Sequence, residues 1–340
     1  MAGVSTPLLA AEVSQAGAIG SIGLGSSTPD VARTMIQEVR ERTDRAFNVN
    51  FFVHEPARHN QDQEAKWIER LSPAFAQFGV IAPRELREIY KSFNEDAAML
   101  AMLLESPPPL VSFHFGAPKP QIVRALHERG VLLLATATNL DEARDLERAG
   151  IDILVAQGIE AGGHRGIFNT AADDPGLGTL ALTRLLVRET NLPVVAAGAI
   201  MDGAGIAAAS ALGAIAGQMG TAFISCPESA ADEAYRSALF GEGNKQTHFT
   251  SAISGRPARS LPGGFSEAPF HTEDYADIPD YPIAYDAAKA LHSAAKQHGE
   301  HKYGAFWAGQ GAPLCRAMPA RRLIQKLAIE FDEACTIAAQ

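Results

Sequence analysis

Short apolar runs rich in Val, Ile, Leu and Phe alternate with segments of helical periodicity along most of the chain. Continuous apolar runs of this length are typical of strands buried on both faces, as in a parallel sheet covered by helices. Seven strands are predicted, at 18–22, 47–52, 110–115, 131–136, 153–157, 193–197 and 217–223. Amphipathic helices are predicted at 7–16, 29–42, 118–129, 140–149, 176–190, 204–212 and 229–239. This alternation favours a (β/α)8 barrel, an α/β fold.

A barrel of eight strands needs one strand more than the seven predicted. The chain opens with Met1-Ala-Gly-Val-Ser-Thr-Pro7, which has the character of a loop leading into a helix. We expect the first barrel strand to belong upstream of Met1 and to be absent from this sequence. A sheet that is open by design is the alternative.

Two stretches do not fit a plain barrel. Residues 53–109 begin with a polar, His-rich loop, and residues 241–340 begin with a segment rich in Pro, Gly and aromatic residues. Four further helices are predicted in these stretches, at 61–79, 83–104, 283–297 and 314–334. We expect 1–52 and 110–240 to form the barrel, and the two stretches to form a smaller, mostly helical lid over its C-terminal mouth, where barrels keep their active sites.

Composition narrows the class of protein. The chain has 340 residues, of which 46% are hydrophobic and 20% charged, so it holds ample apolar material for a core. Its formal charge is −10, from 29 basic and 39 acidic residues, which argues against nucleic acid and anionic membrane surfaces as partners. Three scattered cysteines make no disulfide framework, and no uncharged apolar run reaches the roughly 18 residues that cross a bilayer. We therefore expect a soluble, cytoplasmic protein.

The most informative motif follows the predicted strand 153–157. The segment Gln157-Gly-Ile-Glu-Ala-Gly-Gly-His-Arg-Gly166 combines four glycines with Glu, His and Arg. Glycines at the C-terminal end of a barrel strand let backbone N–H groups approach a ligand closely. His164 is the side chain here that exchanges a proton near neutral pH, which makes it the candidate catalytic residue.

Glycines also follow the next two predicted strands, at Gly198 and in Gly217-Gln-Met-Gly-Thr221. In this part of a barrel a phosphate is commonly held by backbone amides and a helix N-terminus, and Thr221 adds a hydroxyl donor. No strand is followed by GxGxxG and the chain has no GxxxxGK[ST], which argues against a Rossmann site and a P-loop.

Other polar residues are open to two interpretations. Asn50 faces the barrel interior, either to meet a ring with polar edges or as a satisfied core amide. His114 faces the mouth or the core. Arg256 and Arg259 could clamp an anion, although a solvated turn is expected there. The histidines of segment 54–59 lack metal-ligand spacing, so no metal site is expected.

These motifs resemble those of the nitronate monooxygenases, formerly 2-nitropropane dioxygenases, which are FMN-dependent TIM-barrel enzymes. The resemblance covers nearly the whole chain. It rests on Met1-Ala-Gly-Val-Ser-Thr-Pro7, Asn48-Val-Asn50, Ser112-Phe-His-Phe115, Gln157-Gly-Ile-Glu-Ala-Gly-Gly-His164, Gln218-Met-Gly-Thr221, Ser254-Gly-Arg-Pro-Ala-Arg259 and Phe306-Trp-Ala-Gly-Gln-Gly311.

The resemblance implies a site and a reaction. His164 would be the catalytic base, and His114, Trp307 and Gln310 would face the substrate. The implied FMN-binding residues are Met1, Ala2, Asn50, Gln157, Gly162, Gly163, Gly198, Gln218, Met219, Gly220 and Thr221. An alkyl nitronate, such as propionate 3-nitronate, would be oxidised by O2 to a carbonyl compound and nitrite, a detoxifying reaction. A homodimer is compatible with this assignment.

Two other functions stay open at this stage. One is an NAD(P)H-dependent flavin reductase acting on quinones or enoyl thioesters, which shares the flavin-binding loops. The other is a truncated, non-catalytic barrel that serves as a binding or scaffold protein. The role of His164 also has two forms, since it could deprotonate a neutral nitroalkane or, as imidazolium, stabilise the nitronate anion.

Overall fold

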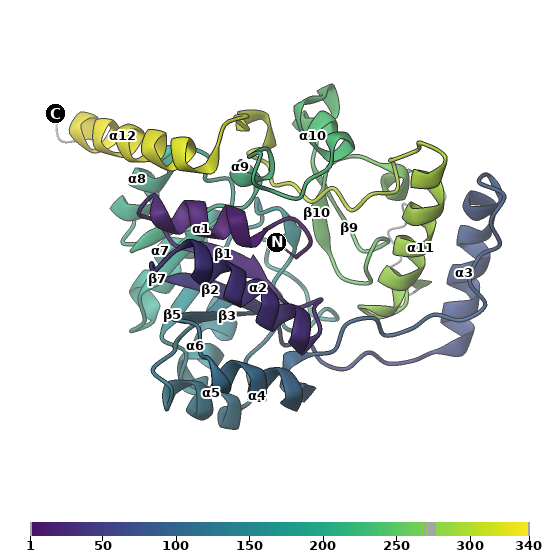
Figure 1. Cartoon of the computed structure of the whole chain (residues 1–340), viewed down its shortest axis with the longest axis horizontal. Coiled ribbons are helices and arrows are strands. Elements are labelled where there is room, and N and C mark those ends of the chain that lie inside the picture. Colours follow the sequence, from purple (N-terminus) through teal and green to yellow (C-terminus); the bar gives the residue numbers. More distant parts are fainter. Residues whose placement is uncertain (1, 268–269, 271–276, 339–340) are drawn as a thin grey trace.

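A curled parallel sheet forms the centre of the computed structural model, which describes residues 2–267, 270 and 277–338 (Figure 1). Its seven strands are β1 (Gly20–Gly23), β2 (Phe47–Phe52), β3 (Leu110–His114), β4 (Leu132–Ala137), β5 (Ile153–Gln157), β7 (Val194–Ala197) and β8 (Ala216–Gln218). They lie side by side in that order, each parallel to the next, with β1 and β8 at the two edges. The predicted α/β, TIM-barrel-like fold is thus confirmed.

The apolar runs locate all seven strands, but the last of them is much shorter than predicted. The strand predicted at 217–223 ends at Gln218, because a short helix α9 (Thr221–Ile224) begins three residues later. Gly220 separates the two elements. A glycine at this point is typical of a turn from strand to helix, which the apolar character of the run conceals.

Helices cover the outer face of the sheet. They are α1 (Pro7–Gln15), α2 (Pro29–Arg42), α4 (Ala97–Glu105), α5 (Pro120–His127), α6 (Leu140–Ala149), α7 (Thr179–Glu189) and α8 (Gly203–Ala211). Several begin at a side chain that accepts a backbone hydrogen bond, such as Thr28, Asn139 and Asp202. Val49 and Leu154 of the sheet and Leu103 of α4 are fully buried in the core between the two layers.

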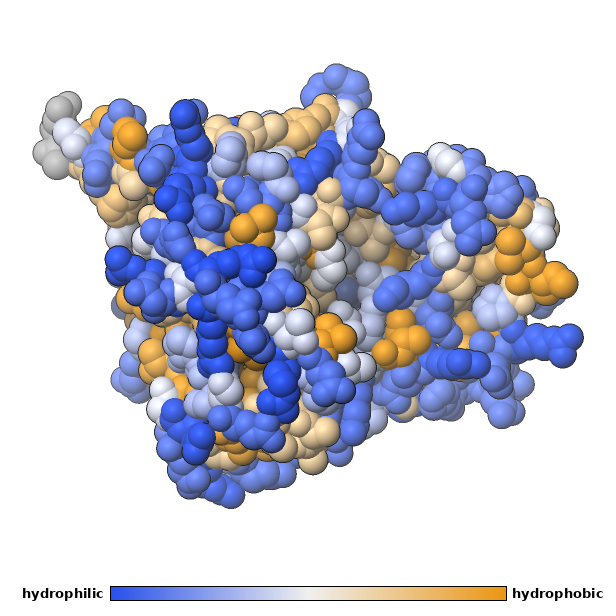
Figure 2. All heavy atoms as spheres, viewed as in Figure 1, coloured by the Kyte–Doolittle hydropathy of each residue, from blue (hydrophilic) through white to orange (hydrophobic). Residues whose placement is uncertain are grey.

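A second group of elements lies beside the sheet. Helices α3 (Gln61–Ala76) and α11 (Ile283–Gln297) pack against each other around Trp67 and Leu291 (Figure 1). Near them are the antiparallel strands β6 (Gly163–His164), β10 (Ala258–Ser260) and β9 (His248–Thr250), the helix α10 (Glu233–Phe240), and the 3-10 helices η2 (Glu242–Lys245), η3 (Gly264–Ser266) and η5 (Ala312–Leu314). A further 3-10 helix, η1 (Phe93–Glu95), packs instead against α4 and against Phe51 of the sheet. Figure 2 shows that the surface is hollowed between this group and the sheet-bearing part.

The prediction of a helix over 83–104 is wrong for its first half. The helix α4 begins only after Asp96, whose side chain accepts a hydrogen bond from the Met99 amide and so fixes the start. The two-part domain division stays a prediction. Helix α4 and the last helix, α12 (Ala320–Ala338), lie outside its barrel segments but pack against barrel helices, α4 on α2 and α12 on α8 and α1. No described helix is long and apolar enough to cross a membrane.

The contact between α8 and α12 allows little space at Gly203. A Cβ atom at this position would lie 2.2 Å from the backbone nitrogen of Phe331 in α12, and the Gly203 amide donates to Glu330 Oε2 over 3.1 Å. We predict that Gly203→Ala lowers the free energy of unfolding by about 2 kcal/mol, as overpacking does elsewhere. Urea unfolding followed by circular dichroism measures the change.

Gly205→Ala, in the same helix, is the matched control. A Cβ at Gly205 meets its nearest neighbour at 3.4 Å, an ordinary contact, and alanine favours the helix. We expect this variant to unfold at the wild-type urea concentration or slightly above it. Equal destabilisation by both substitutions would contradict the packing argument.

Candidate active site

His164 lies just beyond the C-terminal end of β5, in the short strand β6. Its carbonyl oxygen accepts hydrogen bonds from Gln157 Nε2 (3.0 Å) and lies 3.1 Å from His114 Nε2. The Gly166 amide donates to Gln157 Oε1 over 2.7 Å. Because Gln157 and His114 end strands β5 and β3, the sheet itself fixes the backbone of the glycine-rich loop.

The His164 ring is held by a hydroxyl and an aromatic wall. Its Nε2 lies 2.8 Å from Ser254 Oγ, which in turn donates to the Arg256 carbonyl over 3.2 Å. The ring centroids of Trp307, Phe115 and Tyr281 lie 5.1, 5.5 and 5.5 Å from that of His164. Burial, helped by the charge of Arg256, lowers the pKa of His164 to about 3, so its imidazole is neutral at physiological pH.

His114, which was predicted to face the substrate, contacts the backbone of the glycine-rich loop at His164. Its Nδ1 lies 3.0 Å from Thr136 Oγ1, while its Nε2 meets the His164 carbonyl. Burial lowers its pKa to about 4, so this ring is neutral as well. The next residue, Phe115, has φ of 80°, a conformation that side chains other than Gly rarely adopt and that collects at functional sites.

An ion pair closes the other side of the loop. Arg165 is fully buried and makes two hydrogen bonds to Asp174, from Nε to Oδ2 (2.7 Å) and from Nη2 to Oδ1 (2.9 Å). A third bond reaches the Gln157 carbonyl. Burial opposes ionisation of Asp174, but the hydrogen bonds from Arg165 outweigh it and hold the pKa of that carboxyl below its usual range.

Backbone amides collect at the C-terminal ends of β7 and β8. Gly198, with φ of +136°, turns the chain out of β7, and a Cβ there would lie 2.4 Å from Thr179 Oγ1. Within the described residues, the amides of 199, 219 and 220 donate to no protein group. A Cβ at Gly220 would meet nothing within 4 Å, so open space lies in front of it. Such an array of free N–H groups suits an anionic group such as a phosphate.

The remaining predicted ligands border the same region. Gly162 sits against the segment that holds Trp307, since a Cβ would lie 2.4 Å from the Gly309 nitrogen, and Thr221 Oγ1 accepts from that same nitrogen over 3.0 Å. Gly163 pairs with Arg259 in β10. Gln218 is exposed at the end of β8, and Met219 is half-buried after it.

Two amide side chains lie on the barrel interior. Asn50 donates from Nδ2 to Ser112 Oγ over 2.9 Å, which leaves its Oδ1 available. Both polar atoms of Gln157 are used by the loop. The structure thus gives Gln157 a positioning contact that its sequence position does not reveal.

The predicted residues at the chain ends are dispersed. Ala2 lines a cavity of about 200 Å³ together with Tyr285 and Trp307, whereas Met1 lies outside the described residues. The backbone N–H of Gln310 donates to the Glu160 carbonyl over 2.9 Å, and the Gln310 side chain is exposed. Of the predicted substrate-facing residues, only Trp307 presents its ring to the His164 imidazole.

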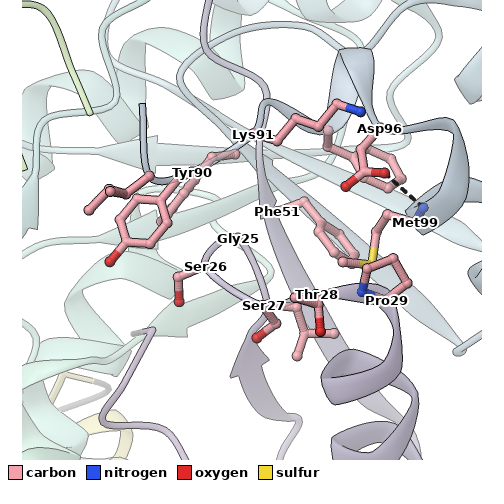
Figure 3. Close-up of a pocket in the computed structure, with 14 residues that line it drawn as sticks. Gly25, Ser26, Ser27, Thr28, Pro29, Phe51, Tyr90, Lys91, Asp96 and Met99 are labelled. Carbon is pink, nitrogen blue, oxygen red and sulfur yellow. Dashed lines mark hydrogen bonds between the residues drawn. The ribbon is translucent and has the colours of Figure 1, made fainter. Parts of the chain in front are cut away.

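A separate cavity of about 220 Å³ opens at the ends of β1 and β2. Figure 3 shows Ser26 and Ser27 of the loop before α2 on one side, with Tyr90 and Lys91 across from them. Phe52, which also lines it, lies 5.0 Å from the Phe115 ring, so the aromatic wall separates this cavity from His164.

Several residues of the site had no clear sequence signal. Ser254, Tyr281 and Tyr285 reach His164 from the part of the chain outside the barrel. The expectation of a solvated turn at Arg256 and Arg259 is wrong, because both are only 6% exposed. The motif Ser254-Gly-Arg-Pro was visible in the sequence, yet turn-forming residues do not reveal that their turn is buried.

The geometry agrees with comparisons to known proteins. The sequence profile described as nitronate monooxygenase matches residues 1–330. The chain belongs to the nitronate monooxygenase family. A relative named nitronate monooxygenase from Paraburkholderia phytofirmans is 53% identical over 98% of this chain and 91% of its own length. One of the same name from Pseudomonas aeruginosa is 52% identical over 97% and 94%. The chain is thus an enzyme of this family.

Solved structures support the same assignment. A structure described as nitroalkane oxidase from Streptomyces ansochromogenes superposes with a TM-score of 0.88 and 38% identity, covering 99% of this chain and 94% of that one. FabK from Thermotoga maritima superposes with a TM-score of 0.75 and 31% identity, covering 100% and 93%. The fold is therefore shared with a solved structure that does not carry the nitronate monooxygenase name.

The ion pair beside His164 leads to a stability prediction. We expect Asp174→Asn to lower the free energy of unfolding by about 2 kcal/mol, because it leaves the buried Arg165 without its counter-charge while Asp174 itself keeps some solvent contact. The Asp174 carboxyl has a lowered pKa when folded, so its stabilisation is complete above the unfolded value of about 3.8 and is lost as the pH falls further. Urea unfolding at pH 7 and pH 3 measures both effects.

Asp173→Asn provides the control, because Asp173 is exposed and neighbours Asp174 in the chain. It should unfold like the wild type at both pH values. A difference between Asp174→Asn and the wild type that persists undiminished at pH 3 would show that the ion pair is not its cause.

Proposed function

We propose that this enzyme uses FMN to oxidise alkyl nitronates, such as propionate 3-nitronate, with O2 to a carbonyl compound and nitrite, and that His164 is its base. The names of the relatives and of the nitroalkane oxidase structure support the substrate class. The observation that carries the proposal is a neutral imidazole at the C-terminal mouth of the barrel, the same end of the sheet at which backbone amides after β7 and β8 have no partner among the described residues. When bound, FMN supplies the electron transfer from the nitronate to oxygen.

The residues present suit FMN. The unpaired amides after β7 and β8 and the open space at Gly220 suit the phosphate, as at other barrel phosphate sites. The free Oδ1 of Asn50 and the interior position of that side chain suit the polar edge of a flavin ring. Thr221 Oγ1 accepts a hydrogen bond from the Gly309 amide, and this bond fixes the segment around Gly309 beside the proposed phosphate site.

The hydrogen bonds around His164 assign its proton. With the Ser254 hydroxyl donating to the Arg256 carbonyl, Nε2 of His164 donates to Ser254 Oγ. Nδ1 then carries the lone pair. It has no hydrogen-bond partner among the described residues and keeps contact with solvent, so it is the atom that takes a proton from a neutral nitroalkane. A nitronate has already lost that proton and needs only to be bound and oriented.

If His164 is the base, its replacement should reduce the rate of nitrite formation by an amount that depends on the substrate. We expect His164→Asn to reduce nitrite formation from a neutral nitroalkane by about 100-fold, the usual contribution of a general base, and to affect oxidation of propionate 3-nitronate less. Nitrite assays with both substrates, and the visible absorption spectrum for flavin content, measure this. His127→Asn, on the outer helix α5, is the control and should keep wild-type rates.

Unaltered turnover of the neutral nitroalkane by His164→Asn would refute the base role while leaving the FMN proposal intact. A purified protein that stays colourless with added FMN would refute the flavin proposal. Rapid anaerobic bleaching of bound flavin by NADH or NADPH would favour the flavin reductase instead.

The lowered pKa of His164 predicts an unusual pH profile. Because its imidazole is already neutral far below pH 6.5, the rate on a neutral nitroalkane should not fall as the pH drops from 8 to 5, and should decline only as the pH approaches the His164 value of about 3. The pH dependence of kcat/KM measures this. An inflection near 6.5, the ordinary imidazole value, would contradict the burial of His164.

A further inference from the structure

Arg256 is a buried cation with almost no partners. Its side chain is 94% buried, from an exposed fraction of 6%. A guanidinium has five N–H donors, but Nη2 donates to the Ile167 carbonyl and Nε has no hydrogen-bond partner in the described part of the chain. Its carbon lies 4.3 Å from the centre of the Phe115 ring. An unpaired buried charge is costly for stability, so folding alone does not account for it.

The two other buried arginines near the site have more partners than Arg256. Arg165 has a bidentate pair with Asp174. Arg259 donates to the Ile159 carbonyl from two nitrogens and to the Thr247 carbonyl over 3.1 Å. Among the described residues, Arg256 has neither the carboxylate partner of Arg165 nor the three carbonyl bonds of Arg259, since its guanidinium makes one hydrogen bond, to the Ile167 carbonyl.

The two carboxylates whose charges act on Arg256 already have other hydrogen-bond or ion-pair partners. Glu142 accepts bonds from Thr138 and from the Phe168 amide, and Asp280 pairs with Arg58. The other groups that face the guanidinium are neutral: burial raises the pKa of Tyr281 and lowers that of His54 to about 4. Among the residues that the structure describes, none therefore pairs its charge with that of Arg256.

The guanidinium lies one aromatic ring from the reaction site. Phe115 neighbours both groups, 4.3 Å from the Arg256 carbon and 5.5 Å from the His164 centroid. The Arg256 main chain also holds Ser254, the partner of His164. In such a poorly hydrated site a charge acts over this range far more strongly than in water.

We propose that Arg256 makes the site selective for anionic substrates, with its uncompensated charge completed by the bound anion. This inference rests on the proposed function, in which that anion is a nitronate. Arg256 acts through the field in the pocket and through Ser254, so it is a positioning and specificity residue. A neutral nitroalkane gains nothing from this charge.

The test uses nitrate, a planar anion with the shape of a nitronate group, and the purified full-length enzyme. Calorimetry should give a nitrate Kd about tenfold higher for Arg256→Gln, which keeps donors for Ile167 but loses the charge. Arg256→Lys, which keeps the charge, should stay within about threefold of the wild type. Arg236→Met removes a half-buried guanidinium whose hydrogen bonds go to the Cys226, Ser229 and Ala231 carbonyls. It controls for the loss of an arginine outside the loop that holds His164 and should leave the nitrate Kd unchanged.

Kinetics add a second measurement. Arg256→Gln should raise KM for propionate 3-nitronate about tenfold with kcat less affected, and should leave KM for a neutral nitroalkane within about twofold. Equal weakening by Arg256→Gln and Arg256→Lys, or by Arg256→Gln and Arg236→Met, would overturn the proposal. If neither the wild type nor any variant forms nitrite, the proposed function is wrong. The nitrate-binding measurements then still test the role of Arg256.

The wild type gives a test that does not depend on folding of a variant. It should bind nitrate at least about tenfold more tightly than a neutral nitroalkane of similar size. Similar affinities for the two ligands would overturn the role of Arg256 even if Arg256→Gln does not fold.

Discussion

The two contacts to the His164 carbonyl are the constraint on which the site depends. Gln157 and His114 end two strands of the sheet and reach the same oxygen atom, so the position of a loop is set by the packing of the core. The opposite side of the ring is fixed by Ser254, which comes from the elements beside the sheet. The His164 imidazole is therefore held in this position only when both parts of the molecule are assembled.

The fold was predictable because the strands of a covered parallel sheet appear in the sequence as short apolar runs. Strands buried on both faces must be apolar throughout, and all seven were located from that property. Helix starts at Thr28 and Asn139 were visible because the orphan amides of a helix need a side-chain acceptor. The errors at 217–223 and 83–104 arose where a glycine or a late cap interrupts a segment whose hydrophobic pattern continues.

The site was only partly predictable, and the limit is sequence distance. His164 was singled out because glycines next to a strand end are typical of a ligand-binding loop, which is a local signal. Ser254, Tyr281 and the burial of Arg256 depend on contacts with residues far away in the chain. Local periodicity contains no information about such contacts, and a turn that is buried by another element has the same residues as a turn in solvent.

The positive charge of Arg256 near His164 affects both proton transfer to His164 and the choice of substrate. A positive charge near a histidine weakens that histidine as a base, because protonating it would place two cations together. The same charge strengthens the binding of an anion. If Arg256 acts as proposed, the site therefore gains affinity for nitronates at the expense of its ability to deprotonate nitroalkanes. A substrate that arrives already ionised avoids that cost and supplies the missing counter-charge, so the buried arginine and the low pKa of His164 together favour the nitronate as the substrate.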